Sequence, residues 1–311
     1  MIGRIVEISE NGRNLSLFRG FLIVQDKTSE WREIGRIPLD DILAVIAHAH
    51  GLTYTNNLLV ELAKRNIPFV LSSDDHEVVG MLWPVDGHHQ QAKRFDAQIA
   101  MTLPKKKSLW ADIIRIKVKM QLWSLSLYGI ESKYLERLRQ SIKSGDPHNI
   151  EGQAAREYWK LLFGSKFVRD RQSLGINTLL NYGYTVFRSA MARAIIAAGL
   201  HPSIGLHHSN DFNAMRLVDD LLEPFRPIVD VIVKKIWIES QYHETPLELT
   251  PTNKRLLVQG LFQNALVNDD VLPVMVAMQK LALSLAKVLL KEQNKLTLPQ
   301  SFNFSNDGFE F

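Results

Sequence analysis

The segment 205–227, GLHHSNDFNAMRLVDDLLEPFRP, contains the kinds of side chain that bind divalent metals. A histidine pair, His207 and His208, is followed by Glu223 in an acidic run. Histidine nitrogens and carboxylate oxygens are common metal ligands, and a bound metal organises phosphate chemistry. The segment therefore predicts a metal-dependent enzyme, provided that the fold brings these groups together.

The acidic run has two interpretations. Asp220 and Glu223 are three residues apart, so they share one face of a predicted helix. Carboxylates this close repel each other unless a cation lies between them. That cation is a metal in one interpretation and the guanidinium of Arg226 in the other, which would make the cluster only an ion-pair network. Asp219, next to Asp220, leaves open which of the two acids supports Glu223.

A further acid, Glu151, lies at the start of the predicted helix 150–163. Helical steps from Glu151 fall on positions such as Ala154 and Tyr158, so the carboxylate is in line with an apolar stripe. An unpaired carboxylate directed at a core costs free energy, and a metal would offset that cost. Alternatively, Glu151 is only a favourable charge near a helix N-terminus that is capped around Asp146.

Charge and composition indicate which substrate such a site would take. The 311 residues are 46% hydrophobic, enough for a folded core, and the net charge is +4. Between Asp86 and Lys119, eight basic residues face three acidic ones, a local balance of 8 − 3 = +5. A stretch of this kind attracts phosphate backbones, although it is equally typical of a solvated helix face. The basic residues expected to contact DNA are Lys93, Arg94, Lys105, Lys106, Lys107, Arg115, Lys117 and Lys119.

Several classes of protein are excluded or disfavoured. The chain has no cysteine, which excludes disulfides and thiolate metal sites and fits a cytoplasmic location. The N-terminus, MIGRIVEISENGRNLSL, is polar and unlike a signal peptide. The apolar stretch 271–290 is interrupted by Lys280 and Lys287, so we expect a buried amphipathic helix rather than a membrane span.

The periodicity of apolar residues changes once along the chain. RIVEIS and FLIVQD, near the N-terminus, have the composition of strands, with one helical pattern after Thr55. Beyond about residue 85 the apolar spacing is helical almost throughout. We therefore predict an α+β protein with a small β-rich, sandwich-like domain over 1–84, a linker at its end, and a large all-α domain over 85–311, with a disordered tail from about 299. The main helices are expected at 109–127, 150–163, 176–198, 216–223 and 271–290.

Taken together, these motifs resemble those of CRISPR-associated protein one, the integrase and endonuclease of spacer acquisition. The run GLHPSIGLHHSNDFNAMRLVDDLLEPFRP is similar to the family's glycine–proline–histidine motif followed by Asp-Leu-x-Glu-x-Phe-Arg-Pro. The segment 176–200, INTLLNYGYTVFRSAMARAIIAAGL, is similar to a helix of the same family. The order of a β-rich domain followed by a helical domain also fits, so the resemblance covers nearly the whole chain.

The resemblance assigns roles to individual residues. Glu151, His208 and Glu223 would be the catalytic residues and the ligands of Mg²⁺ or Mn²⁺, with Asp220 as a further candidate ligand. His208 is favoured over His207 because Gly205 lies three positions before it. The implied reaction is a transesterification, in which a DNA 3′-hydroxyl attacks a phosphodiester of the CRISPR repeat.

The resemblance also implies partners. These are double-stranded DNA, as foreign fragment and as CRISPR repeat, a second copy of the chain that makes contact through the N-terminal domain, and CRISPR-associated protein two in a heterohexamer. The pattern looks most like the type II branch, whose effector nuclease is a further candidate partner. Two other functions are possible in principle: a DNA-binding scaffold without catalysis, and a hydrolase of small phosphoesters. The intact ligand set argues against the first, and the basic stretch without a glycine-rich phosphate loop argues against the second.

Overall fold

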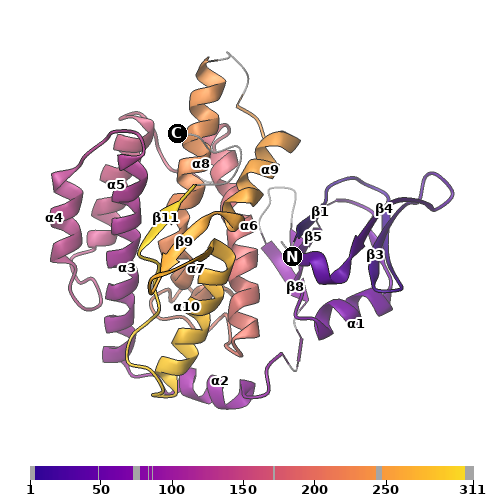
Figure 1. Ribbon diagram of the computed structural model, residues 1–311, viewed down its shortest axis with the longest axis horizontal. Helices are drawn as coiled ribbons and strands as arrows, with labels where there is room; N and C mark the ends of the chain where they lie inside the picture. Colours follow the sequence, from indigo (N-terminus) through magenta and orange to yellow (C-terminus); the bar gives the residue numbers. More distant parts are fainter. Residues whose placement is uncertain are drawn as a thin grey trace. The chain divides into compact units, whose positions relative to one another are not determined.

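The computed structural model describes residues 4–47, 49–72, 78–82, 84–85, 87–170, 172–242 and 247–304. The chain divides into two compact units, residues 1–91 and 92–311. The first unit is rich in strands and the second in helices (Figure 1), which confirms the predicted α+β fold class.

The first unit is built from two four-stranded sheets and one helix. One sheet has the order β1 (Arg4–Ile8), β5 (Ile42–Ala47), β7 (Phe69–Ser72), β8 (Val78–Leu82). The other has the order β4 (Arg32–Pro38), β3 (Phe21–Asp26), β2 (Arg13–Phe18), β6 (Thr53–Tyr54). Helix α1 (Asn56–Lys64) contributes Leu58 and Leu62 to a core that also takes Val45 from the first sheet and Leu22 from the second. Since side chains alternate along a strand, each sheet buries one face against this shared core.

The second unit is a helical bundle around two long helices, α3 and α6. Helix α6 packs against α7, α8, α9 and α10, while α3 packs against α4, α5 and α8 (Figure 1). The helices are α2 (Gln91–Ile99), α3 (Leu103–Ser126), α4 (Lys133–Ser141), α5 (Ile150–Phe163), α6 (Ile176–Ala197), α7 (Arg216–Leu222), α8 (Arg226–Tyr242), α9 (Pro251–Gln259) and α10 (Val274–Leu289). No helix in the described ranges is long and apolar enough to cross a membrane.

A small antiparallel sheet in the second unit differs from the predicted all-helical pattern. Its order is β10 (Asp270–Pro273), β9 (Asn264–Val267), β11 (Ser301–Asn303). The helix expected to begin at 271 begins at Val274 instead, because the three preceding residues pair with β9. The expected disorder from 299 is wrong for 301–303, which pair with β9 and bury Phe302. Residues 305–311 of that tail lie outside the described part of the chain.

Candidate metal centre

Two of the predicted acids, Glu151 and Glu223, are joined by one lysine. Glu151 lies in the first turn of α5, and Glu223 opens a short 3₁₀ turn that follows α7. The ammonium of Lys117, in the middle of α3, lies 2.6 Å from Glu151 Oε1 and 2.5 Å from Glu223 Oε2. The fold therefore brings together two carboxylates that are far apart in sequence at one position occupied by a positive charge.

The start of α5 shows why Glu151 is free to make this contact. The two carboxylate oxygens of Asp146 accept the backbone N–H groups of Ile150 and Glu151, at 2.8 and 2.9 Å. The side chain of Asn149 accepts the N–H of Gly152 at 3.1 Å. These two residues satisfy the unpaired donors of the first turn. The carboxylate of Glu151 is therefore not needed for capping, and it pairs with Lys117 instead.

Glu223 is the most tightly held member of the cluster. It is 4% exposed, and Arg226 Nε donates to its Oε1 at 2.9 Å. Oε2 is buried and has no hydrogen-bond partner of acceptable geometry among the described residues, although Lys117 Nζ lies close to it. Burial alone would raise the pKa of Glu223, but the charges of Arg226 and Lys117 outweigh it and hold the pKa at about 2. Glu223 is therefore ionised at neutral pH.

Lys117 also remains charged. Its burial would lower its pKa, but the charges of Glu223 and Glu151 outweigh this effect and raise the pKa above its ordinary value. The basic stretch predicts Lys117 as a DNA contact, and the structure corrects that prediction because the side chain is buried against the two acids. The helical spacing of the sequence could have indicated this burial, because Lys117 is in line with Ile113 and Ile114 on the apolar side of α3.

Asp220 organises the loop that carries the histidine pair. It is fully buried, and its Oδ2 accepts the backbone N–H groups of Leu206 and His207 at 2.6 and 3.2 Å. Its Oδ1 accepts the backbone N–H of His208 at 3.2 Å and lies 2.6 Å from the Nδ1 of the same residue. A Cβ on Gly205 would come within 2.9 Å of Asp220 Oδ2, so the loop can wrap the carboxylate only with glycine there.

This arrangement gives Asp220 and His208 different roles. Both oxygens of Asp220 are already engaged, so it is better suited to position His208 than to bind a metal itself. The hydrogen bond to Asp220 is the main cause that raises the pKa of His208 above its usual range. A carboxylate that accepts from Nδ1–H leaves Nε2 as the free nitrogen, and this is how histidine ligands of metals are commonly held.

The two residues that left the ligand set ambiguous both have other partners. The ring of His207 stacks on the buried Trp110, with ring centroids 4.3 Å apart and 4° between the planes. Asp219 is held by Arg188, whose Nε and one terminal nitrogen each lie 2.9 Å from its oxygens. His208 and Glu223 are therefore the better candidates for the site.

Whether these residues fit a divalent metal depends on Lys117. In the described part of the chain, no three histidine, aspartate or glutamate side chains stand together as a ready ligand set. The chemistry nevertheless fits, because the carboxylates of Glu151 and Glu223 already share one cation position. The ionised Glu223 and His208 also interact electrostatically. A metal at this position would require Lys117 to give up at least one of its two contacts.

The remaining basic residues are not equivalent. Arg94 is buried and donates to the carbonyl oxygen of Ala198 at 2.7 Å, so the structure corrects its assignment as a DNA contact. Lys93, Lys107 and Lys119 are exposed, and these three remain predicted DNA contacts. Three more that are half-buried also remain predictions: Lys105, Lys106 and Arg115.

A buried carboxyl behind the site was not predicted from the sequence. Asp230, on α8, accepts hydrogen bonds from Tyr158 at 2.9 Å and from Tyr184. Arg226, which pairs with Glu223, lies over the ring of Tyr184, 4.8 Å from its centroid. Burial raises the pKa of Asp230 to about 7, against the opposing effect of the two tyrosine hydrogen bonds. The network thus supports the arginine that holds Glu223.

We expect the Asp230→Asn variant to gain stability relative to wild type as the pH rises from about 4 to about 7. An unfolded aspartate ionises near its ordinary pKa of about 4, whereas folded Asp230 ionises at about 7. Between these values the folded protein binds more protons than the unfolded chain, so the wild type loses up to about 1.4 kcal/mol per pH unit from this group. Urea unfolding at pH 5 and pH 7 measures the effect. A difference between variant and wild type that does not change with pH would contradict it.

The chain is similar to known proteins over most of its length. The family model of CRISPR associated protein Cas1 matches residues 6–261. The chain is 32% identical over 294 residues to the CRISPR-associated endonuclease Cas1 of Neisseria meningitidis serogroup C (strain 8013). The alignment covers 94% of each of the two chains.

Solved structures share the fold. A casposase bound to its integration product matches with a TM-score of 0.77 and 22% identity, over 94% of this chain and 92% of that one. A chain of a Cas6-RT-Cas1–Cas2 complex matches with a TM-score of 0.73 and 17% identity, over 95% of this chain and 36% of that one. At these identities the likeness concerns the fold.

Proposed function

Because the chain belongs to the CRISPR associated protein Cas1 family, we propose that it is a metal-dependent DNA endonuclease and integrase of CRISPR adaptation. It would join short foreign DNA fragments to the repeat array. The observation that supports this most is the meeting of Glu151 and Glu223 at one cation position, next to the loop that holds His208. We infer that these three residues hold Mg²⁺ or Mn²⁺.

The reaction exchanges one phosphodiester bond for another. The 3′-hydroxyl of the fragment loses its proton as its oxygen forms a bond to a phosphorus of the repeat. The bond from that phosphorus to the 3′-oxygen of the neighbouring nucleotide breaks, and the released 3′-oxygen takes up a proton. When water attacks in place of the 3′-hydroxyl, the same phosphorus–oxygen bond breaks and the strand is cut, with a terminal phosphate on one end and a hydroxyl on the other. A bound metal would lower the pKa of the attacking hydroxyl and stabilise the negative charge that develops on the phosphate oxygens.

The residues of the chain prepare the site for this chemistry. Arg226 holds the carboxylate of Glu223 in place and keeps it ionised. Asp220 fixes the ring of His208 so that Nε2 is available. The mostly buried surroundings strengthen each of these electrostatic interactions, because little water competes for them. Residues held in this way need little rearrangement when charge develops on the substrate.

The proposal includes partners and a location. We infer that the protein acts on double-stranded DNA in the cytoplasm, forms a homodimer through its N-terminal domain, and assembles with CRISPR-associated protein two. The Cas1–Cas2 complex among the structural matches supports the last of these. Membership of the type II branch and contact with its effector nuclease remain predictions.

A joining assay tests the proposal. The purified chain is incubated with CRISPR-associated protein two, a short duplex with free 3′-hydroxyls and a supercoiled plasmid that carries a repeat, with Mn²⁺ or Mg²⁺. We expect covalent joining of the duplex to the plasmid, which EDTA abolishes. Tight DNA binding without joining or cutting under either metal would instead support the non-catalytic scaffold.

We expect Asp220→Asn to weaken Mn²⁺ binding and joining by roughly 10- to 100-fold, the usual effect of losing a residue that orients a metal ligand. Asparagine cannot accept all the backbone N–H groups that Asp220 accepts, and it lowers the pKa of His208 by removing the charged partner. Isothermal titration with Mn²⁺ measures the affinity.

Asp219→Asn is the matched control, because Asp219 is the adjacent acid and pairs mainly with Arg188 at 2.9 Å, whereas Arg226 lies 4.0 Å from it. Its Mn²⁺ affinity should stay close to that of wild type. An equal loss of affinity in both variants would show that Asp220 has no particular role in holding His208.

A further inference from the structure

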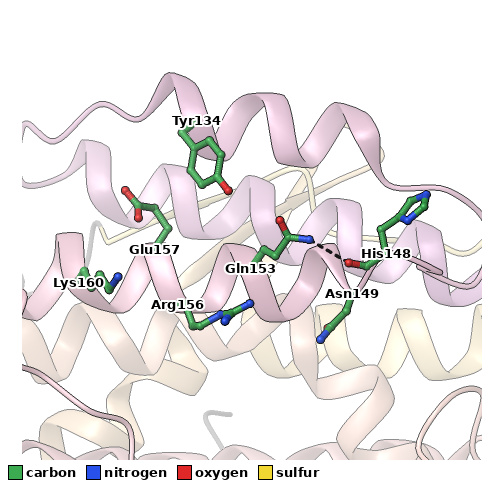
Figure 2. Close-up of a pocket in the computed structure, with 7 residues that line it drawn as sticks. All are labelled: Tyr134, His148, Asn149, Gln153, Arg156, Glu157 and Lys160. Carbon is green, nitrogen blue, oxygen red and sulfur yellow. Dashed lines mark hydrogen bonds between the residues drawn. The ribbon is translucent and has the colours of Figure 1, made fainter.

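A polar pocket of about 380 Å³ lies between α4 and α5. Figure 2 shows the side chains that line it. Its volume lies within the range of small-ligand sites. Tyr134 comes from α4, and the other lining residues come from the start and the outer face of α5: His148, Asn149, Gln153, Arg156, Glu157 and Lys160.

The pocket faces away from Glu151. Successive residues of an α-helix are rotated by about 100°, so Gln153, Arg156 and Lys160 lie on the side of α5 opposite Glu151. The Glu151 side continues through Ala154 and is buried. The pocket therefore shares no side chain with the candidate metal centre, although both begin within the first turn of the same helix.

Two cations in the pocket, Arg156 and Lys160, have no carboxylate partner within the described ranges of the chain. Among the described residues, neither Arg156 nor Lys160 forms an ion pair, and Arg156 uses only its Nε, which donates to the carbonyl oxygen of Gly152 at 3.3 Å. The terminal nitrogens of the guanidinium remain available. With Glu157, the three charged side chains sum to 2 − 1 = +1. Arginine and lysine one helical turn apart present donors suited to the oxygens of a phosphate.

The remaining residues suit a nucleobase. Tyr134 is 48% exposed, and its ring points from α4 toward α5 (Figure 2). Asn149 accepts a bond through Oδ1 and keeps Nδ2 as a donor, while Gln153 donates through Nε2 to His148 and keeps Oε1 as an acceptor. An exposed aromatic ring beside a spare donor and a spare acceptor can stack on a base and contact its edge.

We propose that this pocket binds an unpaired nucleotide of DNA, with its phosphate on Arg156 and Lys160 and its base stacked on Tyr134. The proposal rests on the proposed function for the identity of the polymer, since a free nucleotide has the same chemistry. It adds a second contact for a DNA strand, on the opposite side of α5 from the acids that would hold the metal.

Equilibrium binding in EDTA tests the pocket without any catalytic step. The full-length protein is titrated with a fluorescent eight-nucleotide single strand and with a blunt duplex, for wild type, Tyr134→Ala and the double variant Arg156→Gln/Lys160→Gln. The control is Lys133→Gln/Arg137→Gln, which removes two exposed cations of α4 that do not line the pocket. Melting curves confirm that each variant is folded.

We expect Tyr134→Ala and the Arg156/Lys160 double variant each to weaken single-strand binding by roughly tenfold, with less than a twofold effect of the control. Since each phosphate contact on a single strand contributes about 0.7 to the salt slope, and the two cations share one phosphate, the double variant should also reduce that slope by about 0.7. Blunt-duplex binding should change no more than in the control.

Equal effects of pocket and control variants, or none on the single strand, would overturn the proposal. If a free deoxynucleotide competes at concentrations well below those of the oligonucleotide, the ligand of the pocket is a free nucleotide and not a nucleotide within a DNA strand. The binding assay contains no metal and therefore does not depend on catalysis. If the pocket variants weaken binding but the wild type never joins DNA in the joining assay, only the proposed function is contradicted.

Discussion

Replacing Glu151 with glutamine should reduce DNA joining and cutting about a thousandfold or more, while the protein remains folded. The proposed metal site loses one of its charged oxygen ligands, and an effect of several kcal/mol on the transition state corresponds to this factor. Glutamine keeps the shape of the side chain, and Glu151 is only partly buried. Lys117 keeps its pairing with Glu223, so the fold should lose little stability.

The joining assay with Mn²⁺ gives the rate, and unfolding in urea gives the stability. Glu131→Gln is the control, because Glu131 is an exposed acid ahead of α4 and lies outside both the candidate metal centre and the α4–α5 pocket. Its rate should equal that of wild type. If Glu151→Gln joins DNA at the wild-type rate, Glu151 is not a metal ligand, and α5 then contributes no ligand to the site.

The sequence was most informative where a single helix has a strong period. The predicted bounds of α5, 150–163, agree with the structure, and those of α6 agree to within one residue. The same period showed that Glu151 points toward buried neighbours, because that follows from helical geometry alone. Such inferences hold because they depend only on contacts within one element.

Contacts between distant segments could not be predicted in this way. The apolar stripe of α3 indicated that Lys117 is buried, but only the packing of α3 beside α5 and the 223–225 turn shows that it lies between two acids. The sheet β10-β9-β11 was missed for a similar reason. Its strands have only three or four residues, too few to show a period, and β11 pairs with a segment more than thirty residues earlier.

Neighbouring residues with the same side chain also limited what could be predicted about the site from the sequence. His207 and His208 have the same chemistry, and so do Asp219 and Asp220, so composition cannot choose between them. The two acids differ in the direction of their side chains, because consecutive residues of α7 face different neighbours. Asp219 pairs with Arg188, whereas Asp220 accepts hydrogen bonds from the loop that carries the histidines. The resemblance to a known family had favoured His208 and Asp220, and the hydrogen bonds of the loop give a physical reason for that preference.

Lys117 connects the stability of the protein to metal binding. Its ammonium compensates two carboxylates, one of them almost completely buried, at the position proposed for a divalent metal. Removing one member of a buried ion pair is costly, because the remaining charge stays in a poorly solvated place. The lysine and a metal would therefore offset the same negative charge. Each should contribute less to the stability of the protein when the other is present.

We expect Lys117→Gln to destabilise the metal-free protein by about 3 kcal/mol or more, and Mn²⁺ to restore much of that loss. Urea unfolding in EDTA and in saturating Mn²⁺ measures both effects, with Lys119→Gln, an exposed lysine of the same helix, as the control. Substitution of the control should change stability by no more than about 0.5 kcal/mol. Because the ammonium no longer competes, Mn²⁺ should stabilise Lys117→Gln more than wild type. Equal stabilisation of both by Mn²⁺ would mean that the lysine and the metal occupy different positions.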